Sequence, residues 1–424
     1  MSRIRPRAAS TGTGDRTRPR AALPALCATQ ITGWGVLYYA FPVLNSAVTA
    51  DTGWSPAATT AAFSAALLVS AVAGVPIGRV LDARGPRAVM TGGSVLAVAG
   101  LLVVARAPGL AVFTAGWLLV GVAMAATFYQ PAFAALTRWW GAERVRALTT
   151  VTIAGGLAST VFAPLTAVLA EHLSWRATYA VLAGVLAVVT VPAHALALRG
   201  PWPPAPQQAV RPACDAPDPA PGAVTRSRPF LLLAAAFTLS GFAMHCVVVA
   251  LVPLLTERGV STTAAAWALG LGGAGQTLGR TLYGAVARRT GVRARTAAFI
   301  AAGGATTAAL AVVPGPYPLL VTIAVAAGAV RGNLTLLQAT AVTDRWGATR
   351  YAHRSALLAV PVTLAGASAP FAGAALAGAF GGHAGLFAVL AGVSALGACL
   401  ALGTATRGSP PRTALRRRAA AEAS

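Results

Sequence analysis

The sequence predicts an all-α membrane protein with twelve transmembrane helices, arranged as two pseudo-symmetric six-helix bundles. Three observations predict this fold: sparse charge, twelve long apolar stretches, and short motifs that recur in the second half. Of the 424 residues, 56% are hydrophobic and 10% are charged. A soluble chain needs roughly a quarter of its residues charged to cover its surface. The composition therefore favours a chain that lies mostly in lipid.

Polar residues cluster in the sequence and leave apolar stretches of about 18 to 27 residues between them, long enough to cross a bilayer core of about 30 Å as helices. Inside lipid every backbone group must find its partner within the segment, so we expect each stretch to be helical. The predicted spans are Ala22–Asn45, Thr59–Val80, Ala88–Ala105, Leu110–Leu136, Ala147–Ala170, Ala177–Leu198, Phe230–Leu255, Thr263–Val286, Thr296–Val313, Pro318–Val342, Ser355–Phe380 and Ala384–Gly403.

The basic residues predict the orientation. The formal net charge is +23, and all 33 basic residues are arginines. If both termini are cytoplasmic, 29 arginines fall in inner tails, loops and helix ends and three in outer loops. The positive-inside rule then predicts a multi-pass protein with both termini inside. This placement accounts for the basic excess, so we expect no nucleic-acid partner. The Ala-, Arg- and Gly-rich usage is typical of a GC-rich bacterial genome, so we expect a bacterial inner membrane.

A proline-rich segment divides the chain. Residues 199–229 hold nine prolines, a composition typical of an extended linker. The predicted parts are a cytoplasmic tail (1–21), a six-helix bundle (22–198), the linker (199–229), a second six-helix bundle (230–403) and a second cytoplasmic tail (404–424).

Short motifs recur across the two bundles. Residues 180–185 recur as residues 388–393, at an offset of 208, and Trp140-Gly141-Ala142 recurs at an offset of 206. Six-helix repeats are typical of secondary transporters, in which substrate binds between the repeats near the bilayer midplane.

The predicted loop after the second span carries Gly78, Asp82, Gly85 and Arg87. A Gly, an Asp four residues later and a Gly three further on, with flanking basic residues, resemble the signature loop of the major facilitator superfamily. The resemblance covers all twelve spans and implies alternating access. It also implies that these four residues gate the transporter rather than bind substrate. The alternative is an ordinary basic loop that only fixes topology.

The motif departs from the family pattern at two positions. Ala83 and Pro86 stand where the family commonly has basic residues, so a complete charge relay is not expected. Arg138 and Glu143, in the next inner loop, are the predicted partners of this gate.

The first span narrows the resemblance. Gly33-Trp34-Gly35, Tyr38-Tyr39 and residues 51–55 are similar to the monocarboxylate porter and oxalate/formate exchanger branch, which implies a small organic anion as substrate. Drug–proton antiporters usually carry an arginine in span four, where Trp117 stands, and glycines around the proline of span five, here Pro164. A drug or metabolite exporter of the same superfamily stays as the alternative.

Arg331 is the exception among the basic residues, because it lies in the middle of the tenth predicted span. An arginine at that depth costs about 2.5–3.5 kcal/mol, so it should line a cavity and have a partner. All ten acidic residues fall in tails, loops or helix ends. The counter-charge could then be the substrate, since a guanidinium binds a carboxylate through two hydrogen bonds. The alternative is that backbone carbonyls and water satisfy Arg331.

Further polar residues in the spans complete the predicted substrate site, because a polar side chain in lipid needs a partner. They are Gln30, Tyr38, Tyr129, Gln276 and Gln338. His245, in the outer half of span seven, is the candidate for proton coupling, with a neutral hydrogen-bonding role as the alternative.

No cofactor and no metal site are predicted, because the four cysteines are isolated and no metal-ligand spacing occurs. No nucleophile–base pair or Gly-rich phosphate loop was found either, which disfavours an enzyme. A membrane-embedded enzyme or sensor is the remote alternative. The expected partners are the lipid bilayer, a carboxylate substrate and a coupled proton.

Overall fold

The structure is a computed structural model that describes residues 19–202, 224–346 and 351–404. The first half of the described chain, called the N-half (22–197), is built from α1 (Ala22–Trp34), the π-helical turn η1 (Gly35–Tyr39), α2 (Ala40–Thr52), α3 (Pro56–Arg84), α4 (Pro86–Ala105), α5 (Leu110–Thr127), α6 (Tyr129–Trp140), the 3-10 turn η2 (Gly141–Glu143), α7 (Arg144–Gly156), α8 (Ala158–His172) and α9 (Trp175–Ala197). The second, called the C-half (228–402), is built from α10 (Arg228–Glu257), α11 (Thr262–Arg289), α12 (Val292–Val312), α13 (Tyr317–Trp346), α14 (Tyr351–Ala379) and α15 (His383–Leu402).

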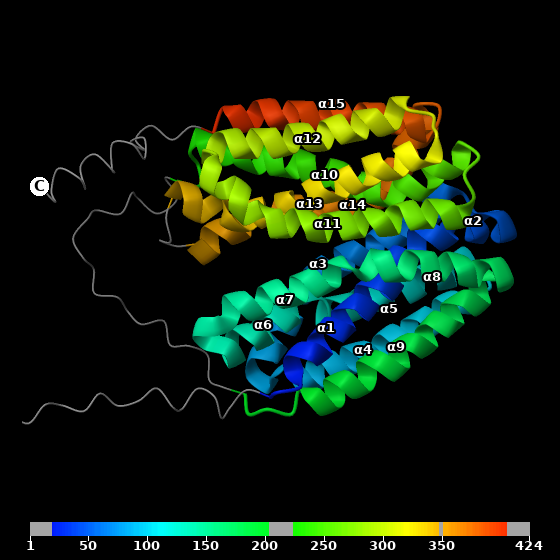
Figure 1. Ribbon diagram of the computed structural model, residues 1–424. Coiled ribbons are helices and arrows are strands. Elements are labelled where there is room, and N and C mark those ends of the chain that lie inside the picture. The colour runs from blue at the N-terminus through cyan, green and yellow to red at the C-terminus, as the bar shows by residue number, and fades with distance from the viewer. Residues whose placement is uncertain (1–18, 203–223, 347–350, 405–424) are drawn as a thin grey trace, which may run out of the picture.

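The helices form two bundles that lie side by side, one from each half (Figure 1). We call the end at which α1 begins and α15 ends the terminal face, and the opposite end the far face. The recurring motifs occupy corresponding helices of the two bundles. Residues 180–185 and 388–393 lie on α9 and α15, and the two Trp-Gly motifs begin at the ends of α6 and α13. The sequence repeat is thus a repeat of structure.

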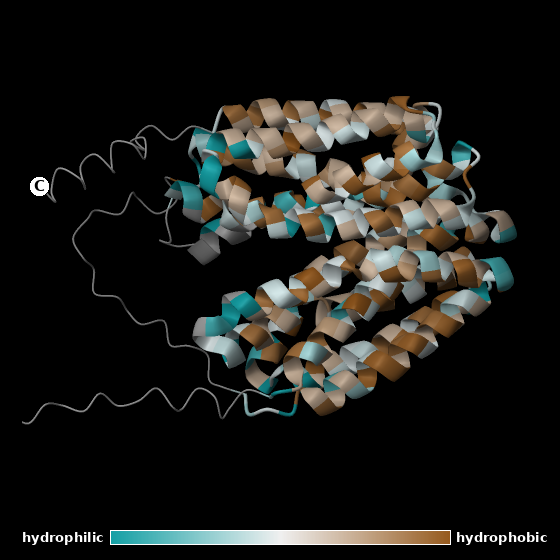
Figure 2. Ribbon diagram, in the orientation of Figure 1, coloured by the Kyte–Doolittle hydropathy of each residue, from teal (hydrophilic) through white to brown (hydrophobic). Residues whose placement is uncertain are grey.

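Among the described residues, ten helical segments are long and apolar enough to cross a membrane. Large apolar side chains are exposed along the helix shafts; Val72, Val188 and Val312 are 72%, 75% and 77% exposed. Figure 2 shows the hydrophobic residues along the shafts and the hydrophilic ones gathered near the two ends. Such a surface is favourable in lipid. The two remaining predicted spans are the run α1–η1–α2, which the π-helical turn divides, and α11, which is rich in glycine.

Three predicted spans are less regular than expected. The first continues to Thr52 and contains the π-helical turn, where a Cβ on Gly35 would overlap the Phe162 ring of α8. The fourth breaks at Phe128, whose backbone is extended, and the fifth breaks at Leu157. Hydropathy gives no sign of the break at Phe128, whereas the break at Leu157 directly follows Gly155-Gly156, a pair that weakens a helix.

Serine caps begin three helices at the far face. The hydroxyl oxygens of Ser55, Ser174 and Ser261 each accept a hydrogen bond of 3.2 Å from the backbone N–H three residues later. The first N–H groups of a helix have no partner within it, and a serine at this position satisfies one of them. The caps therefore fix where α3, α9 and α11 start.

The two halves are joined near the far face and diverge toward the terminal face (Figure 1). Thr263 of α11 donates to Glu171 of α8, and the Thr160 hydroxyl donates to the Gly270 carbonyl oxygen at 2.8 Å. The Ser64 hydroxyl of α3 accepts from the Phe371 backbone N–H of α14 at 3.0 Å. The structure is therefore a conformation with its far face closed.

Candidate functional site

Arg331 lies in the middle of α13 and points toward the neighbouring helices of both halves. Its Nε donates to Gln276 Oε1 of α11 at 3.2 Å, and its Nη2 is buried without a partner among the described residues. Tyr38 and Tyr39 of the N-half are close enough to interact with it electrostatically. A cavity of about 40 Å³ that Arg331 helps to line lies within the C-half, among α10, α12, α13 and α15, and has room for one or two water molecules. Arg331 is thus a partly satisfied cation at the junction of the halves.

Arg280 is a second guanidinium at the same junction. It belongs to α11, where its Nη1 donates to the Thr152 carbonyl oxygen of α7 in the N-half, and its Nε is buried without a partner in the described chain. Its charge acts on Arg331. Sequence analysis counted Arg280 among the inner helix ends, and this was wrong. The helix runs nine residues further, to Arg289, so Arg280 lies roughly 13 Å inside it.

Three tyrosines of the N-half face these two arginines. Tyr38 and Tyr39 belong to the π-helical turn, and Tyr129 begins α6 directly after the break at Phe128. The Tyr129 hydroxyl lies close enough to the Arg280 side chain to interact with it. A phenol can donate or accept a hydrogen bond, so these hydroxyls can serve both the arginines and an anion. The two helix irregularities that hydropathy could not reveal are the elements that position them.

No described carboxylate lies near the middle of a helix. Asp51, Glu171 and Glu257 are at the far-face ends of their helices, and Asp82, Glu143 and Asp344 are at the terminal-face ends. Two guanidiniums that repel each other and lack a carboxylate are costly in a low-dielectric site. An anion that bound between them would relieve this cost.

The glutamines occupy different places. We call Arg331, Arg280 and the three tyrosines that face them the central group. Gln276 accepts a hydrogen bond from Arg331 and therefore belongs to this group. Gln30 is 1% exposed, and its Nε2 donates to the Thr127 carbonyl oxygen at 2.7 Å, so its amide packs α1 against α5. Gln338 lies two turns beyond Arg331 on α13, nearer the terminal face, and is half-buried. The structure brings Tyr38 and Gln276 to Arg331 and Tyr129 to Arg280, and it leaves Gln30 in the packing of the N-half.

His245 lies on α10 next to the central group. Its Nδ1 donates to the Gly241 carbonyl oxygen at 2.7 Å, and its ring packs against Gly366 of α14. It is close enough to Arg331 to interact with it electrostatically. The imidazole is therefore placed where a change in its charge would be felt by the arginine.

The predicted gating residues do not form a loop. Helix α3 continues to Arg84, and Gly85 alone joins it to α4, so the prediction of a loop from Gly78 to Arg87 was wrong. Helix geometry persists because residues 78–84 contain no helix breaker after the glycine, whereas Gly85 adopts a φ of 79° that other residues rarely adopt. A Cβ on Gly78 would meet open space, so this glycine allows no close packing in the present conformation.

Asp82 is ion-paired with Arg138 of α6, one of its two predicted partners. Arg87 donates from Nε to the Ala195 carbonyl oxygen of α9 at 2.9 Å. These contacts stay within the N-half. They join the α3–α4 corner to α6 and α9 at the terminal face.

Trp202, at the start of the linker, packs onto this corner. Its indole Nε1 donates to the Asp82 carbonyl oxygen at 3.0 Å, the Arg138 guanidinium lies 4.4 Å from its ring centre, and the Trp139 ring lies 5.8 Å away. Sequence analysis missed this residue because it treated the whole of 199–229 as linker. The described part, Arg199 to Trp202, is anchored to the N-half, and residues 203–223 lie outside the described residues.

An ion pair at the far face carries a shifted pKa. Asp51 accepts from the Trp175 indole Nε1 at 2.8 Å and from Arg176 at 2.5 Å. The indole hydrogen bond, followed by the Arg176 guanidinium, lowers the pKa of this carboxyl below its usual value. The pair connects the end of α2 to the start of α9.

Comparison with protein families gives one match over most of the chain. The model described as Major Facilitator Superfamily matches residues 26–316 and 233–424. Among curated proteins, monocarboxylate transporter 13 of Bos taurus is 33% identical over 221 residues, which are 50% of this chain and 48% of that protein. The alignment with this curated relative therefore spans about half of its length.

Solved structures show the same fold at low identity. A mutant form of the nucleoside transporter NupG superposes with a TM-score of 0.72 and 14% identity, over 91% of this chain and 99% of that one. A bacterial homologue of the human lysosomal transporter Spinster, in an inward-facing and unoccupied conformation, superposes with a TM-score of 0.67 and 15% identity, over 93% and 95%.

Proposed function

The chain belongs to the major facilitator superfamily and is a secondary transporter, and from this premise we propose that its substrate is a small organic anion, most simply a monocarboxylate. The observation that carries the proposal is the pair Arg280 and Arg331 between the halves, with no described carboxylate at their depth. The likeness to a relative named monocarboxylate transporter 13 supports the same class.

The geometry supports a direct role for both halves in binding. Arg331 and Gln276 come from the C-half, and Tyr38 and Tyr129 come from the N-half. A carboxylate between them would accept from the unpartnered Arg331 Nη2 and Arg280 Nε. Charge-assisted hydrogen bonds of this kind are roughly twice as strong as neutral ones. Because the site has walls from both bundles, its affinity would change as the bundles rock.

We assign the terminal face to the cytoplasm, on the arginine distribution, in a bacterial inner membrane. The conformation described is then inward-facing. Asp82, Gly85 and Arg87, with Gly78 on the same helix end, would brace the N-half corner that meets the C-half when the cytoplasmic side closes. His245 would couple a proton to the anion, since imidazole titrates near neutral pH and lies beside Arg331.

The test is counterflow in proteoliposomes with the purified full chain. Labelled lactate, pyruvate, succinate, uridine and a cationic drug would be offered at pH 6 and pH 8. We expect counterflow of lactate or pyruvate, and faster net uptake when the outside is acidic.

Counterflow of the drug or of uridine without any carboxylate flux would contradict the proposed substrate class. Two results together would contradict only the coupling role of His245. Net uptake of the carboxylate would not depend on pH, and carboxylate counterflow would be retained in His245→Gln.

A further inference from the structure

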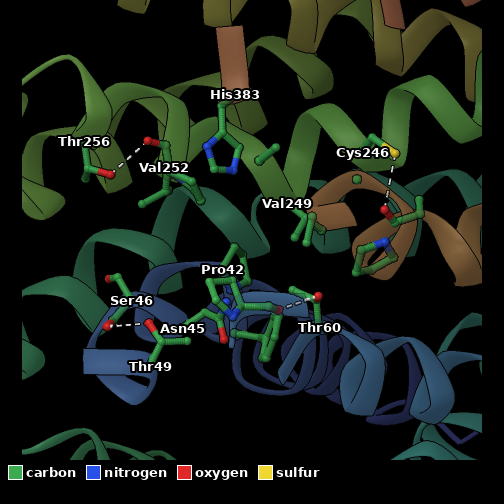
Figure 3. Close-up of a pocket in the computed structure, with 18 of the residues that line it drawn as sticks. Pro42, Asn45, Ser46, Thr49, Thr60, Cys246, Val249, Val252, Thr256 and His383 are labelled. Atoms are coloured by element: carbon green, nitrogen blue, oxygen red, sulfur yellow. Dashed lines mark hydrogen bonds between the residues drawn. The ribbon is translucent and has the colours of Figure 1, made fainter. Parts of the chain in front are cut away.

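A second cavity opens at the far face, between the two halves. Its volume is about 250 Å³, somewhat smaller than the sites of drug-sized ligands, which start at about 300 Å³. We call it the vestibule. Figure 3 shows Asn45, Ser46, Thr49 and Thr60 of the N-half on one side of it, and residues of the C-half, among them Thr256 and His383, on the other. None of these residues belongs to the central group.

Each of three threonine hydroxyls in the vestibule already donates its proton to a backbone carbonyl oxygen. Thr49 donates to the Ser46 carbonyl oxygen at 3.0 Å, Thr60 to that of Pro56 at 2.6 Å, and Thr256 to that of Pro253 at 2.9 Å. A hydroxyl has one proton and two lone pairs, so toward a ligand these three groups can only accept.

Asn45 and Glu257 add further acceptors. Asn45 Oδ1 is buried and has no hydrogen-bond partner among the described residues. Both Glu257 oxygens accept from His383, one from its backbone N–H at 3.0 Å and one from its Nδ1 at 2.5 Å. A carboxylate oxygen has room for a second donor. The vestibule therefore offers mostly hydrogen-bond acceptors and one carboxylate, with the Asn45 amide nitrogen and the Ser46 hydroxyl as donors, whereas the central site offers guanidinium donors.

We propose that the vestibule is a binding site for a small primary ammonium compound, which donates to Asn45 Oδ1, the threonine hydroxyls and Glu257. An ammonium group carries three donors and a positive charge, which match this lining. A carboxylate anion would place a second negative charge beside Glu257 and is disfavoured. The ligand class thus differs from that of the proposed substrate, and binding at the vestibule does not depend on which solute the central site takes.

Binding at the vestibule would hold the far face closed. The ligand touches α2 and α3 on one side and α10 on the other, and these walls separate when the bundles part at the far face. A ligand that contacts both walls binds the closed state better and shifts the population toward it. The vestibule is therefore an inhibitory site that is reached from the far side.

The rate at which Cys246 is alkylated measures the equilibrium between the closed and the open far face. It lies at the wall of the vestibule, is 1% exposed, and its Sγ donates to the Ala369 carbonyl oxygen of α14 at 3.3 Å. The experiment uses the full chain with Cys27, Cys214 and Cys399 replaced by alanine, and measures the rate at which iodoacetamide alkylates Cys246. The probes are ethanolamine and the neutral, equally small ethylene glycol.

We expect ethanolamine to slow alkylation in a saturable manner, by about tenfold, and ethylene glycol to leave the rate unchanged. In Asn45→Leu combined with Thr49→Val and Thr256→Val, the half-effective ethanolamine concentration should rise by about tenfold or more, because hydrogen bonds from a charged donor are lost. The matched control is Thr322→Val, whose hydroxyl donates to the Pro318 carbonyl oxygen on an exposed surface.

Equal potency of ethylene glycol would overturn the ammonium class. An unchanged ethanolamine response in the triple variant, shown by its thermal unfolding to be folded, would overturn the site. Absence of any effect of ethanolamine on the parent chain would overturn both.

Discussion

Gly273 of α11 is the position at which one added methyl group should change the conformation of the transporter. A Cβ there would overlap the Ser159 hydroxyl oxygen of α8 and lie 2.9 Å from Thr160 Oγ1. Optimal separations begin at about 3.5 Å, so the Ser159 side chain would have to rotate away and α8 and α11 would have to move apart. The Thr160 hydroxyl donates across this contact to the Gly270 carbonyl oxygen at 2.8 Å, and the movement would weaken that hydrogen bond.

The cost falls on the closed far face alone, because α8 and α11 belong to different halves. Overpacking costs about 1–3 kcal/mol, which corresponds to a shift of about 5- to 150-fold toward the open far face. We expect Gly273→Ala to speed alkylation of Cys246 within this range, since opening uncovers that thiol. In the same background, Ser159→Ala removes the overlapping oxygen and should restore part of the wild-type rate.

The control for this prediction is Gly184→Ala on α9, where a Cβ would meet open space. It should leave the alkylation rate unchanged. If Gly273→Ala also left the rate at the wild-type value while the protein stayed folded, the α8–α11 contact would not be what closes the far face.

Three further predictions concern the corners of the N-half. Trp202→Ala should lower the free energy of unfolding by about 2 kcal/mol, measured by thermal unfolding, because it loses a hydrogen bond and a cation–π contact. Trp202→Phe loses the hydrogen bond but keeps an aromatic ring, so it should lose less, and equal losses in the two variants would contradict the role of the ring. Gly85→Ala should cost about 1–3 kcal/mol, since φ is 79° and Trp202 lies 3.2 Å from the added Cβ; a change no larger than that of Gly184→Ala would count against this. Asp51→Asn should lower the melting temperature at pH 7. The pKa of Asp51 is lowered in the folded chain, so the carboxylate contributes to stability above the unfolded pKa of about 3.9, and this contribution is lost as pH falls below that value. A difference in melting temperature from wild type that persisted unchanged at pH 3 would refute this.

The scaffold could be predicted from the sequence because lipid imposes a simple rule on it. Apolar stretches must be helices, and arginine-rich loops mark one side. Arg331 stood out for the same reason, as a charge at a depth where charges are costly.

The residues that complete the site were harder to predict. Arg280 lies six residues before the end of the predicted span and close to the arginines that end α11, so the charge pattern counted it with the inner helix ends. The break at Phe128 leaves no mark in hydropathy. The vestibule depends on which lone pairs remain free after the hydroxyl protons are used, and this follows only from the hydrogen bonds of the folded chain.

The central claim is that Arg280 and Arg331 bind the carboxylate of the substrate. The most direct measurement is counterflow of lactate, at concentrations below saturation, in proteoliposomes of Arg280→Gln, Arg331→Gln and the control Arg106→Gln, which changes an exposed far-face arginine. Loss of a charge-assisted hydrogen bond should slow counterflow by about 10- to 100-fold in each of the first two, with the control unchanged. Wild-type lactate counterflow in both Arg280→Gln and Arg331→Gln would contradict the claim.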